Sequence, residues 1–236
     1  ISVDKTGKLK VHTTKAASAV ITASYGPVVQ NVTVTVADGR FWYSLGNGLG
    51  NGLDNNWYLD GNNASVVSSD GNKTTVQMGS GYRGDLWLAR SGKGKIVNVT
   101  PADYRYFAIK VGFKSQLVPG KNKPNGCIKL EIFDDGIKKI GPEYFGTGGD
   151  ANNRYEILGA SEISTTEPNV LYYDLQSKYK TVTPTDWNQV FDLSQCKFVI
   201  ADFPETAQTY DLYWIRSFKS IEELQAFVDS ENNTNE

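Results

Sequence analysis

Residues 209–218 read TYDLYWIRSF, and this stretch gives the clearest indication of the fold. Side chains of a β-strand point alternately to its two faces. One face therefore carries a run of mostly large side chains, namely Tyr210, Leu212, Trp214, Arg216 and Phe218. The opposite face also carries apolar groups, including Ile215. This pattern predicts a central strand of a sheet, with Trp214 in the core.

The residues after this strand predict one short helix. Ser220 and Glu223 have the spacing of a capping box, in which the side chain of each residue accepts a hydrogen bond from the backbone N–H of the other. Apolar residues then recur at helical intervals, at Ile221, Leu224, Phe227 and Val228. The last stretch, SENNTNE, has no apolar side chain to bury, so a disordered tail is expected at residues 230–236.

Upstream of this strand, short alternating segments are divided by clusters of Gly, Asn, Asp and Ser. We expect strands at residues 64–67, 74–78, 81–88, 106–113, 128–133, 170–175 and 197–203. Many short strands with little helix between them are typical of an antiparallel jelly-roll β-sandwich. The fold class is therefore expected to be all-β, with a main domain at residues 38–229 that ends in the short helix.

The first 37 residues show a separate two-residue alternation. Val32, Val34 and Val36 alternate with polar residues, and Tyr25-Gly26-Pro27 predicts a turn before them. The stretch ending in VITASYGPVVQNVTVTV resembles the C-terminal half of a bacterial immunoglobulin-like repeat. The resemblance implies a partial immunoglobulin-like β module at residues 1–37 that serves as a spacer. Its strand edges are expected to be exposed or to pack on the main domain.

Composition and charge argue against two classes of partner. The chain has 236 residues, and its formal net charge is -2 with acidic and basic residues interspersed. Such a surface offers no basic stripe to nucleic acid or to an anionic membrane. No apolar run approaches the roughly 20 residues that span a bilayer, so no transmembrane segment is expected.

The two cysteines, Cys127 and Cys196, each lie in or beside an apolar alternating run. They could form one disulfide across neighbouring strands, or they could be two buried thiols. A domain of this size does not need a covalent cross-link, which favours the thiols. The sequence has no Cys-x-x-Cys motif and a single histidine, so no zinc site is expected.

The stretch from Phe41 to Asp60, FWYSLGNGLGNGLDNNWYLD, combines aromatic residues with Gly and Asn. Gly and Asn suit tight turns, and Trp carries a large apolar face with a polar edge. Loops of this kind can present aromatic platforms on which sugar rings stack. We therefore expect Trp42 and Trp57 to bind a glycan, with hydrogen bonds from Asn56 and Asp60. The alternative is that these tryptophans belong to the core.

A second aromatic and polar block, GYRGDLW, lies at residues 81–87. On a strand Arg83, Asp85 and Trp87 share one face, with Tyr82 on the other. This predicts a second part of the glycan site, in which polar groups bond sugar hydroxyls. The alternative is an ion pair between Arg83 and Asp85 on a solvated strand. Trp187 either extends the aromatic platform or closes one end of the sandwich.

Catalytic chemistry has little support in the sequence. The only histidine, His12, lies in the spacer, so the main domain has no histidine base for a Ser-His-Asp or Cys-His site. Glu131 and Asp135 would lie about 13 Å apart along a strand, whereas glycoside hydrolases need two carboxylates at roughly 5–9.5 Å. Carboxylates of different strands could still converge, among them Glu143, Glu156 and Glu162. We expect no catalytic residues.

A structural calcium ion is the one metal for which the sequence offers ligands. Jelly-roll modules often hold Ca²⁺ with oxygen atoms from loops. The candidate ligands are Asp134, Asp135, Asp150, Asn152 and Asn153. Hydrated turns explain these residues equally well, so no ligand set is assigned and no other cofactor is expected.

Six blocks, in order, carry a further resemblance: RFWYSLGNGLGNGLDNNWYLDGN, MGSGYRGDLWL, FAIKV, VLYYDL, FVIADF and YDLYWIRSFKSIEELQAF. Together they resemble the jelly-roll C-terminal domain of Bacteroidetes cell-surface lipoproteins, which is similar to galactose-binding-like carbohydrate-binding modules. The resemblance implies a noncatalytic glycan-binding protein of a polysaccharide-utilisation system. It also implies secretion to the outer-membrane surface, a lipid anchor upstream, and partner proteins of a glycan-uptake complex. The alternatives are a polysaccharide hydrolase or lyase, and a structural or adhesion protein.

Overall fold

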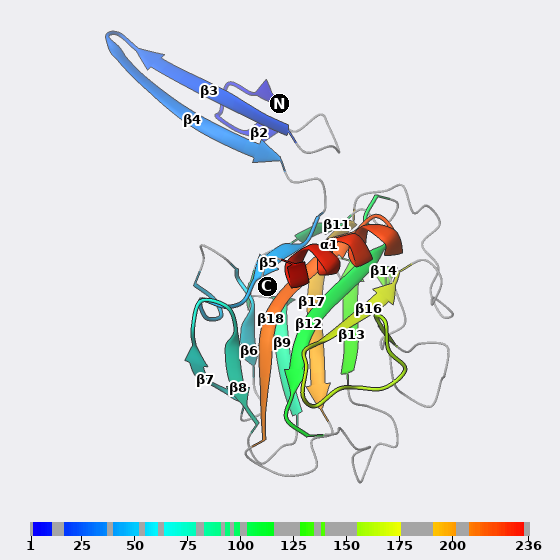
Figure 1. The fold of residues 1–236 in the computed structure, drawn as a ribbon. Coiled ribbons are helices and arrows are strands. Elements are labelled where there is room, and N and C mark those ends of the chain that lie inside the picture. The colour runs from blue at the N-terminus through cyan, green and yellow to red at the C-terminus, as the bar shows by residue number, and fades with distance from the viewer. Residues whose placement is uncertain are drawn as a thin grey trace.

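The structure is a computed structural model that describes residues 2–10, 17–36, 40–51, 55–60, 64–78, 83–90, 93–94, 97–99, 103–115, 128–134, 138–139, 155–175, 191–201 and 208–233. Strands dominate these residues, and the described part of the chain has one helix, α1, at its C-terminal end (Figure 1). The prediction of an all-β chain with a short C-terminal helix is therefore confirmed. The described residues include no helix long and apolar enough to cross a bilayer.

Among the described residues, the strands of the main body form two antiparallel sheets of seven strands each. The first sheet, named here the β9 sheet, has the order β10-β9-β17-β13-β14. In addition, β6 pairs with β9 and β11 pairs with β17. Its strands are β6 (Tyr58–Asp60), β9 (Arg83–Arg90), β10 (Lys93–Gly94), β11 (Val97–Val99), β13 (Ile128–Asp134), β14 (Lys138–Lys139) and β17 (Phe191–Ala201).

The second sheet, named here the β18 sheet, has the order β15-β16-β12-β18-β8-β7, with β5 on β18. Its strands are β5 (Trp42–Ser44), β7 (Ser65–Ser69), β8 (Thr74–Gln77), β12 (Tyr106–Phe113), β15 (Glu156–Ile157), β16 (Asn169–Asp174) and β18 (Thr209–Phe218). The predicted central strand is therefore confirmed, because β18 pairs with β12, β8 and β5.

Both sheets contribute to one main hydrophobic core. Leu86 of β9 and Phe198 of β17 pack in the same cluster as Ile109 of β12 and Ile215 of β18. All four are fully buried. A sheet with one apolar face must bury it against another layer, and here side chains of both sheets share one core.

An extra residue in β18 changes the faces that the sequence predicts. Lys110 of β12 pairs with Trp214, whereas the next residue, Val111, pairs with Leu212. This bulge interrupts the alternation, so Leu212 and Ile215 both belong to the main core while Trp214 belongs to a second cluster. The prediction of strict alternation through Trp214 is wrong for this reason, although Trp214 is buried as expected, with 3% exposed.

Helix α1 (Ile221–Asn233) covers part of the outer face of the β18 sheet, the face turned away from the main core. Phe227 and Leu224 pack with Trp214 and Phe218 there. The Ser220 hydroxyl accepts the Glu223 N–H at 3.2 Å, as a capping box predicts. Glu223 Oε2, however, accepts the N–H of Lys219 at 2.7 Å, one residue earlier than expected.

The helix is longer than the sequence suggests, since residues 230–233 of the expected disordered tail are helical. Glu231 explains the difference. Its Oε2 accepts hydrogen bonds from Lys110 Nζ at 3.0 Å and from Trp214 Nε1 at 3.1 Å, so the last turn is bonded to the sheet. Composition alone could not reveal these tertiary contacts.

The described N-terminal strands form two small hairpins, and no pairing between these strands and the large sheets is seen in the described part of the chain. They are β1 (Ser2–Val3) with β2 (Leu9–Lys10), and β3 (Ala17–Tyr25) with β4 (Val28–Val36). Figure 1 shows the β3–β4 hairpin extending away from the main body. Several of its apolar side chains are exposed, among them Tyr25, Val28 and Val32. The assignment of residues 1–37 to a partial immunoglobulin-like module stays a prediction.

Candidate functional site

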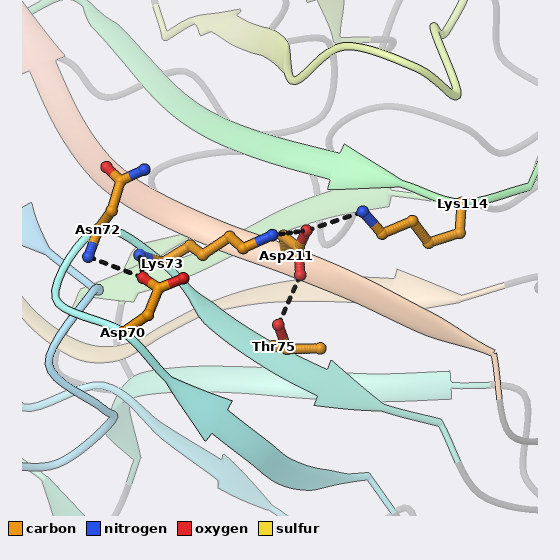
Figure 2. Close-up of polar contacts among 6 residues, drawn as sticks. All are labelled: Asp70, Asn72, Lys73, Thr75, Lys114 and Asp211. Carbon is orange, nitrogen blue, oxygen red and sulfur yellow. Dashed lines mark hydrogen bonds and ion pairs between the residues drawn. The ribbon is translucent and has the colours of Figure 1, made fainter.

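Asp211 is a buried carboxylate on the outer face of the β18 sheet, and three side chains from neighbouring segments bond to it (Figure 2). Lys73 Nζ donates to Asp211 Oδ2 at 2.7 Å, and Lys114 Nζ lies 3.0 Å from the same oxygen. The Thr75 hydroxyl donates to Asp211 Oδ1 at 2.7 Å. Because a buried charge is costly unless it is paired, these bonds are what permit a carboxylate here.

The strand register explains why these residues meet. Asp211 of β18 pairs with Thr75 of β8 on one side and with Gly112 of β12 on the other. Lys73 immediately precedes β8, and Lys114 immediately follows β12. The two lysines therefore approach the carboxylate from the two strands that flank it.

A tight turn fixes the backbone of Lys73. Asp70 Oδ1 accepts the N–H groups of Asn72 at 2.9 Å and Lys73 at 2.8 Å, as Figure 2 shows. Gly71 has a φ of 91°, a conformation that glycine adopts without steric cost. The turn also fits closely against the glycine-rich stretch, since the Gly71 N–H bonds the Gly46 carbonyl at 3.0 Å.

The contacts of this cluster favour the charged forms of Asp211 and Lys73. Burial by itself raises the pKa of Asp211, but hydrogen bonds from Lys73, Thr75 and Lys114 outweigh it and hold the pKa below its usual value. The hydrogen bond to Asp211 in turn raises the pKa of Lys73. A carboxylate held ionised in this way is a poor proton donor or acceptor near pH 7. The arrangement suits binding and structural pairing better than acid–base catalysis.

An aromatic side chain adjoins the charged cluster. Tyr213 is half-buried, and burial raises the pKa of its phenol. Lys110 Nζ lies 5.6 Å from the centroid of the Tyr213 ring. Gly112 adjoins both this ring and Asp211, because a Cβ added there would stand 3.6 Å from Tyr213 Cε2 and 3.5 Å from Asp211 Cβ. The surface thus combines cationic donors with an aromatic ring.

Among the predicted stacking residues that the structure describes, Trp42 is the most exposed, at 41%. It lies on β5 beside helix α1, with ring contacts to Phe218 and Phe227 at centroid distances of 5.7 Å and 5.3 Å. The guanidinium of Arg40 stands 3.7 Å from its ring centroid, and that of Arg216 stands 4.4 Å away. A sugar stacking on Trp42 would have to share the ring with these groups.

Trp57 is fully buried in the main core, where its ring contacts Tyr43 and Phe198. Of the two alternatives for this residue, the core position is the one that the structure shows. The ring is not available for stacking in this conformation. Asn56, its neighbour and another predicted site residue, is partly exposed.

The glycine-rich stretch is organised by Asn55, which the sequence analysis passed over in favour of Asn56. Asn55 is 1% exposed, and its Nδ2 donates to the carbonyls of Ser44 at 3.0 Å and Gly48 at 2.8 Å. Its Oδ1 accepts the N–H groups of Gly50 and Trp57. Much of the Gly and Asn content therefore serves to fold this loop. Two adjacent asparagines gave no signal to distinguish the buried one.

Strand pairing brings together the two predicted halves of the glycan site. On the β9 sheet Asp60 pairs directly with Asp85, and Tyr58 pairs with Trp87. Leu86 and Leu88 lie in the main core, so the positions of Arg83, Asp85 and Trp87 alternate onto the opposite face. Trp87 is buried, with 6% exposed, and Tyr58 is half-buried. We name these positions the β9 outer face; they are Tyr58, Asp60, Arg83, Asp85 and Trp87.

Other predicted residues lie outside the described part of the chain. These are the site residues Tyr82 and Trp187, the calcium candidates Asp135, Asp150, Asn152 and Asn153, the carboxylate Glu143, and Cys127. For Asp134 and Cys196 the structure gives only backbone positions, in β13 and β17. The described residues contain no group of three or more His, Cys, Asp or Glu placed to hold a metal ion.

Sequence patterns did not predict the group formed by Asp211, Lys73, Thr75 and Lys114, named here the Asp211 cluster. The available signal was a carboxylate inside a central apolar strand, because a buried polar residue is more informative than an exposed one. Its partners Lys73, Thr75 and Lys114 lie far from it in sequence and carry no motif. Only the register of three strands reveals the set.

Comparison with known proteins gives one family. The sequence pattern of a domain of unknown function, DUF4979, matches residues 48–224. No curated protein matches the chain significantly. The family match covers most of the chain, including strands β6 to β18 and all four residues of the Asp211 cluster. The chain therefore belongs to the DUF4979 family.

Proposed function

We propose that this chain is a noncatalytic glycan-binding protein of the bacterial cell surface, with a jelly-roll fold like that of galactose-binding-like carbohydrate-binding modules. The site proposed for the glycan is the β9 outer face. The proposal extends to a polysaccharide-utilisation system and an outer-membrane location, on the resemblance carried by the six sequence blocks.

One observation carries the proposal: the register that sets Asp60 opposite Asp85 and Tyr58 opposite Trp87. The two stretches rich in aromatic and polar residues are more than twenty residues apart in sequence, yet they pair on one face. Like charges directly opposite on neighbouring strands destabilise a sheet. Two aspartates at paired positions are thus poorly explained by stability, whereas a ligand rich in hydroxyl groups would use them as acceptors.

The same pairing favours a second candidate, a polysaccharide hydrolase. Directly paired residues of antiparallel strands have Cβ atoms about 4.5–5.5 Å apart. Retaining glycosidases use two carboxyl groups at about 5–5.5 Å. Asp60 and Asp85 are at positions compatible with that spacing. A hydrolase also needs one of the two carboxyl groups to serve as a general acid.

Native affinity electrophoresis of the full chain in gels containing plant, host and microbial polysaccharides tests both candidates. The expected result is retardation by at least one polysaccharide without release of reducing sugar. Asp60→Asn and Asp85→Asn should each weaken that retardation, because an amide replaces an acceptor oxygen with a donor. Asp229→Asn, on the exposed side of α1, is the matched control and should bind like the parent.

Three outcomes would change the conclusion. Release of reducing ends that Asp85→Asn abolishes would favour the hydrolase. Retardation that neither aspartate variant alters would remove the site from the β9 outer face. A full panel without retardation would overturn the glycan-binding proposal and favour a structural or adhesion protein, in line with the burial of Trp57 and Trp87.

A further inference from the structure

The Asp211 cluster carries more cationic groups than its own carboxylate requires. Lys73 and Lys114 both reach Asp211 Oδ2, at 2.7 Å and 3.0 Å, while Thr75 occupies Oδ1. One lysine would be enough to neutralise one carboxylate. The second brings a like charge close to the first, so the trio has one positive charge in excess.

The two ammonium groups have donors to spare, and solvent can reach them. Each ammonium carries three N–H donors and uses one on Asp211. The Lys73 side chain is 30% exposed and the Lys114 side chain 54% exposed, whereas that of Asp211 is 2% exposed. The carboxylate is thus covered and the cations remain accessible. Both lysine nitrogens lie within 3.0 Å of the same oxygen, Asp211 Oδ2, so they are close enough to each other for one anionic group to contact both.

The carboxylate of Asp70, which also acts on Lys73, offsets this excess only weakly. Asp70 is exposed, and its Oδ1 is occupied by the backbone N–H groups of Asn72 and Lys73. Its influence on Lys73 is the smallest of those that raise the pKa of that lysine. Exposed charges of this kind are screened by water and salt.

We propose that Lys73 and Lys114 form a binding site for an oxyanion of an acidic glycan, a carboxylate or a sulfate group, at the surface beside Asp211. Lysine binds such groups as a point charge, and charge-assisted hydrogen bonds are about twice as strong as neutral ones. Tyr213, which is half-buried, supplies an aromatic ring for the sugar that bears the anion. Asp211 is a positioning residue that holds the two ammonium groups together.

This site lies on the β18 sheet, so it does not depend on the function proposed for the β9 outer face. The test is affinity electrophoresis of the full chain at fixed ionic strength in gels containing polygalacturonate, dextran sulfate or neutral dextran. Polygalacturonate presents carboxylates and dextran sulfate presents sulfates, so the two gels separate the two sources of charge. Retardation is expected in at least one acidic gel and not in neutral dextran.

Variants assign that binding to the cluster. Lys73→Met and Lys114→Met keep the apolar stem and remove the charge, and each should raise the dissociation constant roughly tenfold. Lys114→Arg keeps the charge and should retain most of the affinity. Lys219→Met removes an exposed lysine outside the cluster and should bind like the parent.

Several results would overturn the proposal. Equal weakening in Lys114→Met and Lys219→Met would show general attraction to the polymer. No retardation in either acidic gel would leave the second lysine with a structural role only. Binding of inorganic sulfate without retardation by either polymer would show that the site holds a free ion and not a glycan.

Discussion

The indole Nε1 of Trp214 donates a hydrogen bond of 3.1 Å to Glu231 Oε2, which connects the centre of the β18 sheet to the last turn of helix α1. The same oxygen accepts a hydrogen bond from Lys110 Nζ, and Glu231 Oε1 lies 3.6 Å from Arg216 Nη1. One carboxylate thus bonds groups from two neighbouring strands.

Replacing this carboxylate should loosen the helix. Glu231→Ala removes the partner of Trp214 Nε1 and of Lys110, and we expect a loss of about 1–2 kcal/mol in the free energy of unfolding. Urea denaturation followed by tryptophan fluorescence measures it. Asp229→Ala, on the exposed side of the same helix, should change stability by less than about 0.5 kcal/mol. Equal effects of the two substitutions would contradict the role given to Glu231.

The buried amide of Asn55 should contribute more to stability than that of its neighbour. Asn55→Ala leaves two carbonyls and two N–H groups of the glycine-rich stretch without their partner, and should cost about 2–4 kcal/mol. Asn56→Ala, at a partly exposed position, should cost less than about 0.5 kcal/mol. Thermal unfolding of both variants makes the comparison. A larger loss for Asn56→Ala would show that the loop is held differently.

Asp211 should contribute to acid sensitivity. Its pKa is lower in the folded chain than its ordinary value of 3.8, so the stabilisation is present above pH 3.8. It is lost as pH falls through the lower folded-state pKa, when the carboxylate must be protonated. Asp211→Asn should therefore be less stable than the parent at pH 7, and should lose less stability below about pH 4. Urea midpoints measured from pH 2 to pH 7 test this, and parallel curves would contradict it.

Gly112, in β12 of the β18 sheet, and Gly46, just after β5, should differ sharply in the cost of replacement by alanine. A Cβ at Gly46 would lie 2.2 Å from the Gly71 carbonyl oxygen, a backbone atom that cannot easily move. Gly46→Ala should therefore cost about 2–4 kcal/mol or more. Gly112→Ala meets only ordinary contacts, at 3.5 Å or more, and should fold with nearly parental stability. Circular dichroism melting curves distinguish the two, and similar midpoints would argue against the close approach of the two turns.

The fold was largely predictable because its strongest signals are local. Alternation of apolar residues located β12 and β18 to within a residue at each end, and the helix start followed from its capping residues. The bulge opposite Lys110 and Val111 was not predictable, because both faces of β18 carry large apolar side chains. The Trp214 side chain would be buried on either face of the strand, so its burial does not reveal the bulge. For the same reason the second cluster under α1 was not foreseen.

The candidate sites were harder to predict because they depend on pairing between distant strands. The shared face of Arg83, Asp85 and Trp87 follows from alternation, but the partner positions Tyr58 and Asp60 follow only from register. Aromatic content was ambiguous in a further way. Trp42 and Trp57 have similar surroundings in the sequence, yet one is half exposed and the other is fully buried.

The contacts of Glu231 and Phe41 affect the choice of boundaries for a recombinant fragment of this domain. The family pattern begins at residue 48 and ends at residue 224, so it omits β5 and most of α1. A fragment with those limits would lack Phe41 and Leu45, which fill the main core, and Phe227 and Glu231, which cover Trp214. It would expose apolar surface at two places and should aggregate when expressed. The family pattern is therefore shorter than the stretch that forms the core. A recombinant fragment with boundaries near residues 40 and 233 would include all of these core residues.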